Sequence, residues 1–585
     1  MYIQYCIGCE RMRTLFKYLK PYLGRMSLGF FIKVSGTLAE LMLPYILSHI
    51  LKKVVSFGSV KMILFWGSIM LICAGVALVC NIVANRMAAA VSRYFSEAVR
   101  HDLFSKTLHL SSAQTDRFTI ASLESRITSD TYNIHQFVGM MQRMGVRAPI
   151  LLIGGISITL FMDSFLALGM IALLPFIFVT IYFISSKGVP LYTKVQQSVD
   201  GMIRVVREDV QGIRVIKALS KDKYEHKRYD DVNKALVKDE KRAGTIMGSV
   251  NPIMTLLMNA GLVLVISMSA SRVANHTSDP ETVIAFMQYF TQISMAMMTV
   301  TRMFVMYTKS SASAKRIAEV LNCDDELIER SESLYPRKYE DMHIAFDNVG
   351  FSYNGRKNDL ENISFSLKKG QSLGIIGATG SGKSTVLRLL LRFYDVSLGG
   401  IYVNGRDVRT VKREQLYSFF GVALQNDFLY ADTIEENIRF GREISKEKII
   451  EAAKIAQADS FINEFEDGYD HLLSPKGTNI SGGQKQRLFI ARAIAAEPEI
   501  LILDDSTSAL DYRTELELRR ALNEKFSDTT VITVAQRVSA VKNCDLILVL
   551  DNGKIIGSGT HDQLMDSCIE YQEISNSQLG GAFVD

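Results

Sequence analysis

A stretch of nine residues has the composition and spacing to bind a chain of phosphates: Gly377-Ala378-Thr379-Gly380-Ser381-Gly382-Lys383-Ser384-Thr385. It fits the pattern G-x-x-x-x-G-K-[ST], in which the backbone N–H groups of a glycine-rich loop surround a pyrophosphate. We expect Lys383 to reach the β- and γ-phosphates and the Ser384 hydroxyl to ligate Mg²⁺. The stretch predicts a nucleoside triphosphate site with these binding residues: Gly377, Thr379, Gly380, Ser381, Gly382, Lys383, Ser384 and Thr385.

Two further segments suggest contacts with phosphate or Mg²⁺. Ile500–Leu503 reads as an apolar strand that ends at Asp504, the arrangement in which a carboxylate holds Mg²⁺ opposite a phosphate loop. Ser481-Gly482-Gly483-Gln484 opens a helical pattern, so the N–H groups at this helix N-terminus form a second phosphate-binding position. The chain therefore offers two phosphate sites but only one phosphate loop.

The elements around these residues predict an α/β domain over residues 340–585. Ser372–Ile376 reads as a buried strand directly before the phosphate loop, and Val386–Phe393 reads as the apolar helix that follows it. Strands that alternate with helices indicate a partly parallel sheet. The remaining strand predictions are Ile344–Tyr353, Ile363–Leu367, Val531–Ala535 and Leu546–Leu550. A polar segment, residues 310–339, precedes the domain and reads as a helical extension followed by a linker.

The first half of the chain is much more apolar than the second. Hydrophobic residues make up 48% of the 585 residues, and nearly all long uncharged runs lie before residue 310. About twenty apolar residues are needed to cross a bilayer. Six stretches are candidates: Met26–Leu51, Met62–Asn85, Ala148–Met162, Ser164–Ser186, Ala243–Ser271 and Thr282–Thr301. The third is long enough only if its helix continues through Arg143 and Arg147. We expect an all-α, six-helix membrane domain over residues 24–309, after an N-terminal segment, residues 1–23.

The charge distribution predicts the orientation in the membrane. The net charge is +5, and the sequence contains no stripe of basic residues. Both features argue against a nucleic-acid partner. Lys and Arg gather before the first span and in the long connections, residues 86–147 and 187–242, a pattern typical of cytoplasmic segments. We expect a multi-pass plasma-membrane protein with both termini and the α/β domain in the cytoplasm. The basic N-terminal segment lacks an apolar core, so we expect no cleaved signal peptide, and Met12 is an alternative start.

Other polar residues of the first half have less specific interpretations. Cys6 and Cys9 form a C-x-x-C without a second pair or a histidine cluster, so we expect neither a metal nor a redox site. Several polar residues inside the spans should face the bundle interior, as interhelical hydrogen bonds or as the lining of a substrate path: Lys33, Glu40, His49, Asn81, Asn251, Asn259, Gln288 and Gln292. A group of methionines suits either a deformable lining or ordinary packing: Met295, Met297, Met298, Met303 and Met306.

In their order and spacing, the motifs resemble those of ATP-binding-cassette (ABC) transporters, specifically exporter half-transporters with six membrane helices before the nucleotide-binding domain. The resemblance covers essentially the whole chain from about Leu15. It implies that two cassettes pair head to tail, so that each ATP lies between one chain's phosphate loop and the other chain's signature, here Ser481, Gly482, Gly483 and Gln484. The implied cofactors are ATP and Mg²⁺. The implied partners are a second half-transporter, the lipid bilayer and a small-molecule, lipid or peptide substrate.

The resemblance also implies roles for single residues. Tyr353 matches the aromatic residue that stacks on adenine, and Gln425 matches the glutamine that contacts Mg²⁺. The expected Mg²⁺ ligands are Ser384, Gln425 and Asp504. Three segments match the loop at the cassette interface and the two cytoplasmic loops whose coupling helices contact the cassettes: Ser508–Asp511, Leu123–Ile127 and Gly212–Lys217.

Two residues depart from the family at positions where the chemistry is done. The family's general base is a Glu and its switch residue is a His, whereas this chain has Asp505 and Gln536. Asp is shorter by one methylene, and a misplacement of about 1 Å can cost about 10²-fold in rate. Gln carries no positive charge to offer the γ-phosphate. Asp505, Gln536 and Gln425 are the predicted catalytic set. The signature, by contrast, is nearly intact, with Ile480 in place of the usual Leu.

This contrast resembles the degenerate-site subunit of heterodimeric exporters. The predicted function is a subunit of an ATP-driven exporter of amphipathic, drug-like or lipid-like substrates, whose signature completes the partner's catalytic site. Full ATPase activity is then expected only with a partner subunit. Two alternatives remain open: a homodimeric exporter whose slow ATPase uses Asp505 as the base, and an ATP-gated membrane regulator or channel.

Overall fold

The computed structural model describes residues 14–55, 58–274, 280–324, 327–425 and 427–579. Cys6, Cys9 and Met12 lie outside the described residues. The chain forms two compact units. The membrane unit comprises residues 1–108 and 120–323, and the cassette unit comprises residues 109–119 and 324–585.

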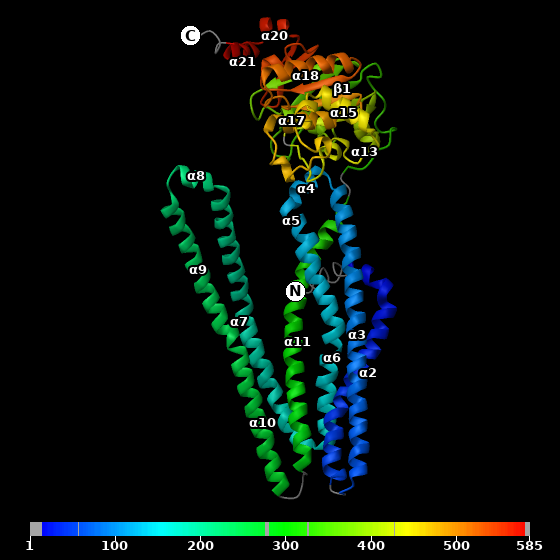
Figure 1. Ribbon diagram of the computed structural model, residues 1–585, viewed down its shortest axis with the longest axis vertical. Coiled ribbons are helices and arrows are strands. Elements are labelled where there is room, and N and C mark those ends of the chain that lie inside the picture. The colour runs from blue at the N-terminus through cyan, green and yellow to red at the C-terminus, as the bar shows by residue number, and fades with distance from the viewer. Residues whose placement is uncertain (1–13, 56–57, 275–279, 325–326, 426, 580–585) are drawn as a thin grey trace. The chain divides into compact units, whose positions relative to one another are not determined.

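The membrane unit is all-α, as predicted (Figure 1). Its long uncharged runs form helices because a helix satisfies every backbone hydrogen bond internally, which a bilayer requires. Six helices in the described part of the chain are long and apolar enough to cross a membrane, which confirms the six predicted spans. The elements are η1 (Lys20–Tyr22), α2 (Leu23–His49), the π-helix η2 (Ile50–Val54), α3 (Val60–His109), α5 (Ile120–Ser125), the π-helix η3 (Arg126–Asp130), α6 (Thr131–Met162), α7 (Ser164–Gln211), α8 (Ile213–Ala218), α9 (Asp222–Gly248), α10 (Val250–Ala274) and α11 (Pro280–Leu321).

The third span is part of a long helix. α6 runs without a break from Thr131 to Met162 and passes through Arg143 and Arg147, as expected for so short an apolar stretch. Arg147 forms an ion pair with Glu40 of α2. The turn after α6 is minimal, because Asp163 caps α7 by accepting hydrogen bonds from the first backbone N–H groups of that helix. The predicted helical hairpin is therefore present.

Helices α2, α6 and α11 approach one another closely. The buried Tyr289 hydroxyl of α11 donates a hydrogen bond to the Leu41 carbonyl of α2, at 2.7 Å. Two glycines of α6 permit this packing, since a Cβ atom at Gly154 would lie 2.6 Å from Leu41 and one at Gly155 would lie 2.8 Å from Ile293. A larger side chain at either glycine would push the helices apart.

Polar residues of the spans differ in their environment. Lys33 is buried and its ammonium donates a hydrogen bond to Asn81 of α3, as predicted for an interior position. Asn259 and Gln288 are exposed on this single chain, so their place in the interior of the assembled bundle stays a prediction. The buried positions of α11 are filled by other residues, among them the fully buried Tyr289.

The cassette unit contains two sheets. A six-stranded sheet has the order β10-β9-β3-β8-β7-β6, and a four-stranded sheet has the order β2-β1-β4-β5. The strands are β1 (Ile344–Phe351), β2 (Leu360–Leu367), β3 (Ser372–Gly377), β4 (Leu398–Val403), β5 (Arg406–Asp407), β6 (Phe420–Ala423), β7 (Ile500–Asp504), β8 (Thr530–Val534), β9 (Leu546–Asp551) and β10 (Lys554–Gly559). Five neighbouring strands, β9, β3, β8, β7 and β6, are parallel, while β10 is antiparallel. The predicted partly parallel sheet is confirmed.

Helices complete the α/β architecture of this unit. They are α12 (Lys383–Leu390), α13 (Arg413–Ser418), α14 (Ile434–Arg439), α15 (Lys446–Ile455), α16 (Asp459–Ile462), α17 (Gly482–Ile494), α18 (Tyr512–Lys525), α19 (Val538–Val541), α20 (His561–Ser567) and α21 (Ile569–Leu579). The central strands β3 and β7 are buried almost throughout, as expected where both faces of a parallel sheet are covered. Their carboxyl ends therefore carry residues out of the core towards a common edge.

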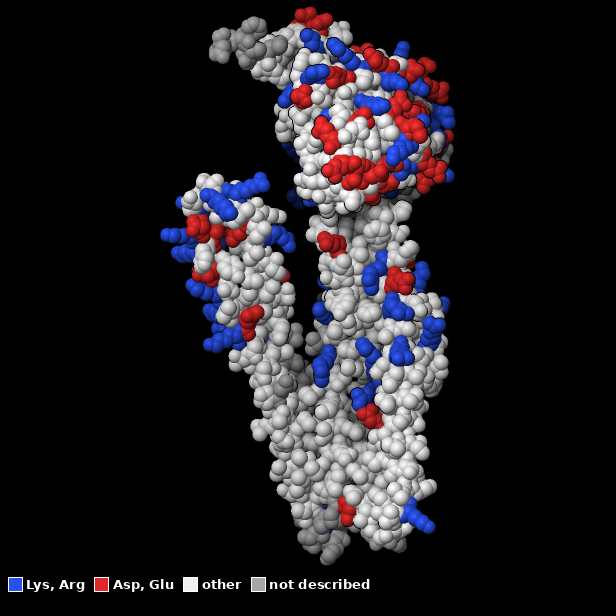
Figure 2. Space-filling model, viewed as in Figure 1, with Lys and Arg blue, Asp and Glu red and all other residues white. Residues whose placement is uncertain are grey.

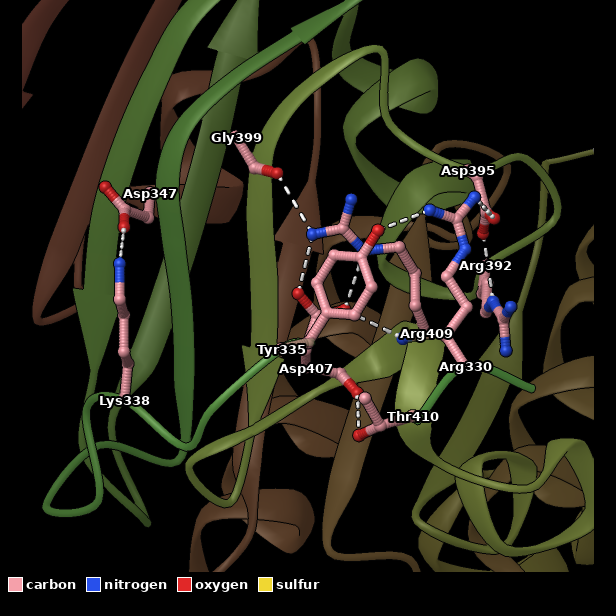
Figure 3. A network of polar contacts seen from close by, with 10 residues as sticks. All are labelled: Arg330, Tyr335, Lys338, Asp347, Arg392, Asp395, Gly399, Asp407, Arg409 and Thr410. Carbon is pink, nitrogen blue, oxygen red and sulfur yellow. Dashed lines mark hydrogen bonds and ion pairs between the residues drawn. The ribbon is translucent and has the colours of Figure 1, made fainter. Parts of the chain in front are cut away.

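The segment before the first strand is fixed to the cassette by side chains (Figure 3). The Arg330 guanidinium contacts the Asp395 carboxylate at 3.2 Å, and the Arg409 guanidinium lies over the Tyr335 ring, 4.3 Å from its centre. The fully buried Asp407 accepts two side-chain hydrogen bonds from Arg409. Through these contacts, the part of the predicted linker that contains Arg330 and Tyr335 packs against the cassette unit.

One short helix from the first half of the sequence belongs to the cassette unit. α4 (Ser112–Phe118) begins with a capping box, which fixes its N-terminus locally. Asp116 of α4 accepts a hydrogen bond from the Tyr394 hydroxyl at 2.6 Å. The helix seen against the cassette thus precedes the predicted coupling segment Leu123–Ile127.

Candidate nucleotide-binding site

The phosphate loop connects the end of β3 to the start of α12. Gly380 and Gly382 have φ angles of +85° and +104°, which favour glycine. A Cβ atom at Gly382 would also lie 2.6 Å from the Leu360 side chain. No side chain caps the N-terminus of α12, so its first N–H groups remain available to an anion. The loop has the backbone geometry of a phosphate site.

Two side chains of the loop have unused capacity for a phosphate. The Lys383 ammonium donates to the backbone carbonyls of Gly377 and Ala378, at 2.8 and 2.7 Å. Burial lowers its pKa from the ordinary value, because a desolvated ammonium lacks the stabilisation of water. The Ser381 hydroxyl is buried and has no hydrogen-bond partner among the described residues. Both groups fit a ligand that brings negative oxygens into the loop.

The residues expected to hold Mg²⁺ lie together. The Ser384 hydroxyl donates a hydrogen bond to Asp504 at 3.2 Å, and both line a cavity of about 220 Å³ with Gln425. Asp504 is only 6% exposed, and burial raises the pKa of its carboxyl above the ordinary value. A divalent cation here would offset that desolvation, and Mg²⁺ prefers oxygen ligands of these kinds. The donor set therefore fits Mg²⁺, with phosphate oxygens and water supplying the remaining ligands.

Asp505 and Gln536 line the same cavity. The Gln425 side-chain amide donates to the Asp505 carboxylate at 3.1 Å, while burial raises the pKa of that carboxyl. Asp505 has a φ angle of +50°, and its N–H donates to the Val534 carbonyl at 2.9 Å, which anchors its backbone to β8. The carboxylate therefore starts from a fixed point beside the expected position of the γ-phosphate.

A helix near the end of the chain holds the loop that carries Gln536. The Gln578 amide of α21 donates to the Gln536 carbonyl at 2.8 Å, and its oxygen accepts the Val538 N–H at 2.8 Å. The sequence did not single out Gln578, since a lone glutamine in a polar helix carries no motif. Its position became apparent only from the packing of α21 in three dimensions.

The expected adenine platform has an aromatic neighbourhood. Tyr353 is 41% exposed, and its ring packs edge-on against Tyr394, with ring centres 5.1 Å apart. The Tyr353 hydroxyl accepts a hydrogen bond from Arg388 at 3.2 Å. Asp359, another residue that the motifs did not reveal, accepts the Tyr353 backbone N–H at 2.8 Å and lines the cavity. These contacts hold an exposed ring close to the phosphate loop.

The signature residues form a separate site on this chain. Ser481 and Gln484 form a capping box at the start of α17, so this N-terminus is rigid. Ser481 and Gly482 are exposed. None of the four signature residues lines the cavity at the phosphate loop. One chain thus presents the two predicted phosphate-binding positions in different places.

The structure brings together most of the predicted site residues. Those that line the cavity are Thr379, Gly380, Gly382, Lys383, Ser384, Thr385, Gln425, Asp504, Asp505 and Gln536. Gly377, Ser381 and Tyr353 adjoin it without lining it. The assigned roles of all these residues stay predictions.

Two family models match the chain. One is described as the ABC transporter transmembrane region and matches residues 26–297, and the other is described as ABC transporter and matches residues 360–508. Relatives of nearly equal length also match. The chain is 32% identical over 578 residues to an uncharacterized ABC transporter ATP-binding protein of Mycobacterium tuberculosis, covering 98% of this chain and 99% of the relative.

A second relative and one solved structure agree with this result. The uncharacterized ABC transporter ATP-binding protein YfiB of Bacillus subtilis is 32% identical over 571 residues, covering 97% of this chain and 99% of that protein. The structure of a bacterial Atm1-family ABC exporter with ATP bound superimposes with a TM-score of 0.80, covering 97% and 99% of the two chains. At 23% sequence identity this likeness concerns the fold alone.

Proposed function

This chain belongs to the ABC transporter family, and we propose that within it the chain is one subunit of a heterodimeric, ATP-driven exporter. The observation that carries the proposal is the contrast between two parts of one cassette. Its signature is nearly intact and rigidly capped, whereas Asp505 and Gln536 stand where the family has Glu and His. An integral membrane protein with such a cassette can complete a partner's site better than its own.

The phosphate loop of this chain would bind ATP strongly. We propose that Tyr353 stacks on adenine and that Lys383 exchanges its two carbonyl partners for the β- and γ-phosphates, a stronger charge-assisted contact. Ser384, Asp504 and Gln425 would hold Mg²⁺, which neutralises charge on those phosphates. The buried Ser381 hydroxyl group would donate a hydrogen bond to the bound phosphates.

Hydrolysis at this loop would be slow for geometric reasons. The backbone of Asp505 is anchored to β8, so its carboxylate cannot advance to replace the missing methylene without breaking that hydrogen bond. Gln536 can donate a neutral hydrogen bond but no charge-assisted one. The Gln578 side chain holds the loop through hydrogen bonds with the Gln536 carbonyl and the Val538 N–H, which restricts the movement of Gln536. The site would bind ATP for long periods and turn it over rarely.

The signature would act on the partner's nucleotide. Ser481 and Gly483 stand at the N-terminus of a thirteen-residue helix, α17, where N–H groups and the helix dipole favour an anion. We propose that they contact the γ-phosphate bound by the partner's phosphate loop. Closure of the two cassettes around two ATP molecules would turn the substrate path outward, and hydrolysis at the partner's loop would reset it.

The orientation and domain limits complete the proposal. The basic long connections support cytoplasmic termini and a cytoplasmic cassette in the plasma membrane. We propose an N-terminal segment of residues 1–23, a membrane domain of residues 24–309, a linker of residues 310–339 and a nucleotide-binding domain of residues 340–585. The apolar, methionine-rich last span supports amphipathic substrates of drug-like or lipid-like character.

The proposal is tested by reconstituting this chain alone, its partner alone, and both together in liposomes. We expect ATP-driven transport and rapid ATPase activity only from the pair, with loss of both when Ser481 is replaced by Ala. A matched control is Ser567→Ala in α20, which removes the same hydroxyl group at an exposed position where, among the described residues, it bonds only the Gln563 carbonyl of its own helix. Full-speed, vanadate-sensitive ATPase activity from this chain alone would overturn the heterodimer.

One observation favours a second candidate, a homodimeric exporter with a slow ATPase. Asp505 keeps a carboxylate in the same cavity as Ser384 and Asp504, and Gln425 orients it. A slow base is therefore present in the chain. In that case the purified chain would form a homodimer, and its modest ATPase activity would disappear on Asp505→Asn.

A further inference from the structure

The helices α2, α6 and α11 carry few acidic side chains to balance their basic ones. Glu40 is the only carboxylate residue between residues 23 and 54, and residues 131–162 and 282–318 contain none. Four basic residues of these helices, here called the basic cluster, occur near the level of Glu40: Lys33, Arg143, Arg147 and Arg302. Figure 2 shows that basic side chains predominate over the middle of α3 and α6. Further lysines flank the α2–α3 turn: Lys52, Lys53 and Lys61.

Helix geometry places the residues of α2 and α6 close together. The ion pair between Glu40 and Arg147 sets the level of α2 against that of α6. Arg143 lies one turn before Arg147, and Lys33 lies two turns before Glu40 on nearly the same face of α2. Because α2 and α6 run in the same direction (Figure 1), both lie on the same side of the ion pair, within about 10 Å of it along the helix axes.

The fourth residue is brought to this level by α11. The Met303 side chain packs on Gly145 of α6, where an added Cβ atom would lie 3.1 Å from the methionine methyl group. Gly145 is midway between Arg143 and Arg147 in the sequence. Arg302, the neighbour of Met303, therefore lies at the same level, and it is exposed on this chain.

The basic cluster lies in the cytoplasmic half of the bilayer under the proposed orientation. Glu40 is fourteen residues from the end of η2 at Val54, and Arg147 is fifteen residues from the end of α6 at Met162. At about 1.5 Å per residue these separations are about 21 and 22 Å, less than the roughly 30 Å of the hydrocarbon core. With Val54 and Met162 placed at the outer boundary of the bilayer, the ion pair lies inside the core and the other basic residues lie near its cytoplasmic boundary.

The positive charge of the cluster is only partly neutralised. Glu40 pairs with Arg147. Lys33 is 4% exposed, and its ammonium donates to the side-chain oxygens of Asn81 and Asn85, at 2.6 and 3.1 Å. These amides satisfy its hydrogen bonds but bring no negative charge.

Among the described residues, the remaining two basic residues have no acidic partner. Arg143 donates to the Gly139 carbonyl at 3.0 Å, and neither Arg143 nor Arg302 forms an ion pair with a carboxylate in the part of the chain that the structure describes. Charges at this depth are costly unless they are paired, and their presence points to function. A bound anion would supply the negative charge that these two residues lack.

The surroundings of the cluster are apolar and exposed. Met141 and Met144, on either side of Arg143 along α6, are 40% and 47% exposed. We propose, on the basis of the export function above, that the basic cluster binds the anionic headgroup of a transported amphiphile. A carboxylate, sulfonate or phosphate would contact Arg143 and Arg302, while the apolar body lies against the methionines.

Binding of matched probes to the assembled transporter tests this inference. The transporter, without nucleotide, is placed in nanodiscs of phosphatidylcholine and titrated with fluorescent dodecyl probes that carry a carboxylate, a maltoside or a trimethylammonium headgroup. We expect the carboxylate probe to bind roughly tenfold to a hundredfold more tightly than the neutral one, the range that one or two charge-assisted contacts provide. Equal affinities for the carboxylate and maltoside probes would overturn the inference.

Three variants separate the cluster from general charge effects. Arg143→Gln combined with Arg302→Gln should abolish the preference, whereas Arg143→Lys combined with Arg302→Lys should retain most of it. Lys61→Gln, at the start of α3, removes the same charge far from the cluster and should retain the preference in full. An undiminished preference in the double glutamine variant would contradict the assignment.

Three further outcomes assign the ligand and keep this inference distinct from the export function. Phosphatidylglycerol that co-purifies with the wild type but not with the double glutamine variant, without any preference among the probes, would assign the arginines to a lipid headgroup and overturn binding of a transported amphiphile. Selective binding without ATP-driven movement of any probe would support the site and remove the export function. Equal ATP-driven movement of all three probes would remove the site and leave the export function.

Discussion

Replacing Asp505 by Glu should accelerate hydrolysis at this chain's own phosphate loop. The substitution extends the carboxylate by about 1.5 Å, the length of one C–C bond, from a backbone that β8 holds in place. Because a misplacement of about 1 Å can cost about 10²-fold in rate, restoring the length should recover up to about 10²-fold, or about 2.7 kcal/mol of activation free energy. The gain requires the new side chain to keep the hydrogen bond from Gln425, now 3.1 Å long.

The assay is a single turnover of radiolabelled ATP in the two-chain transporter, with the phosphate-loop lysine of the partner subunit replaced so that only this chain's site reports. Asp505→Glu should release phosphate faster, and the added Gln536→His should raise the rate further by supplying a charge-assisted contact. Asp505→Asn should change the already slow rate far less than the same change does at a working base. A strong loss of phosphate release on Asp505→Asn, with no gain on Asp505→Glu, would refute the geometric reasoning.

Three further predictions concern the cassette. Asp504→Asn should raise the melting temperature of the nucleotide-free protein at pH 7, because burial raises the pKa of Asp504 above its ordinary value of 3.8 and so disfavours the folded state once the group ionises. The difference in melting temperature between the variant and the wild type should be fully present at pH values above the raised pKa of Asp504. It should disappear as the pH falls through that pKa towards 3.8. Gln578→Ala should leave the fold intact but release the loop that carries Gln536, because two hydrogen bonds to that loop are lost. The Val538 amide should then exchange its hydrogen faster. An unchanged exchange rate would show that Gln578 does not hold the loop. Gly382→Ala should abolish ATP binding in a fluorescent-nucleotide titration and destabilise the loop by about 1–3 kcal/mol. The φ angle of +104° at Gly382 and the 2.6 Å approach of a Cβ atom to the Leu360 side chain exclude a methyl group. Normal affinity for the nucleotide would contradict this geometry.

The sequence predicted most where local chemistry and local structure coincide. The phosphate loop lies between β3 and α12 because its glycines, its lysine and the flanking apolar runs all require that arrangement. The six spans follow from length and apolarity, which a bilayer demands of any segment that crosses it. The continuation of α6 through Arg147 was also predictable, because an apolar run that is too short must extend into polar surroundings.

The sequence predicted least where contacts join distant segments. Gln578 reaches the Gln536 loop only because α21 packs beside α19, and no spacing rule connects those positions. α4 was missed as the helix against the cassette, since its hydrogen bonds join it to the distant residues Tyr394 and Asp324. Gln288 is exposed on the single chain, while the buried positions of α11 combine apolar residues such as Tyr289 with the polar Ser294 and Ser313. Such outcomes depend on which helix faces meet, which the polarity of one residue does not encode.

The most direct test of the division of labour is to identify the nucleotide held by each chain during turnover. The two-chain transporter is supplied with photoreactive, radiolabelled ATP, trapped with vanadate and cross-linked, and the nucleotide attached to each chain is then determined. The account predicts trapped ADP on the partner and intact ATP on the Lys383 loop of this chain. Ser481→Ala should remove the trapped ADP from the partner and leave the ATP on the Lys383 loop. Equal amounts of trapped ADP on the two chains would contradict it.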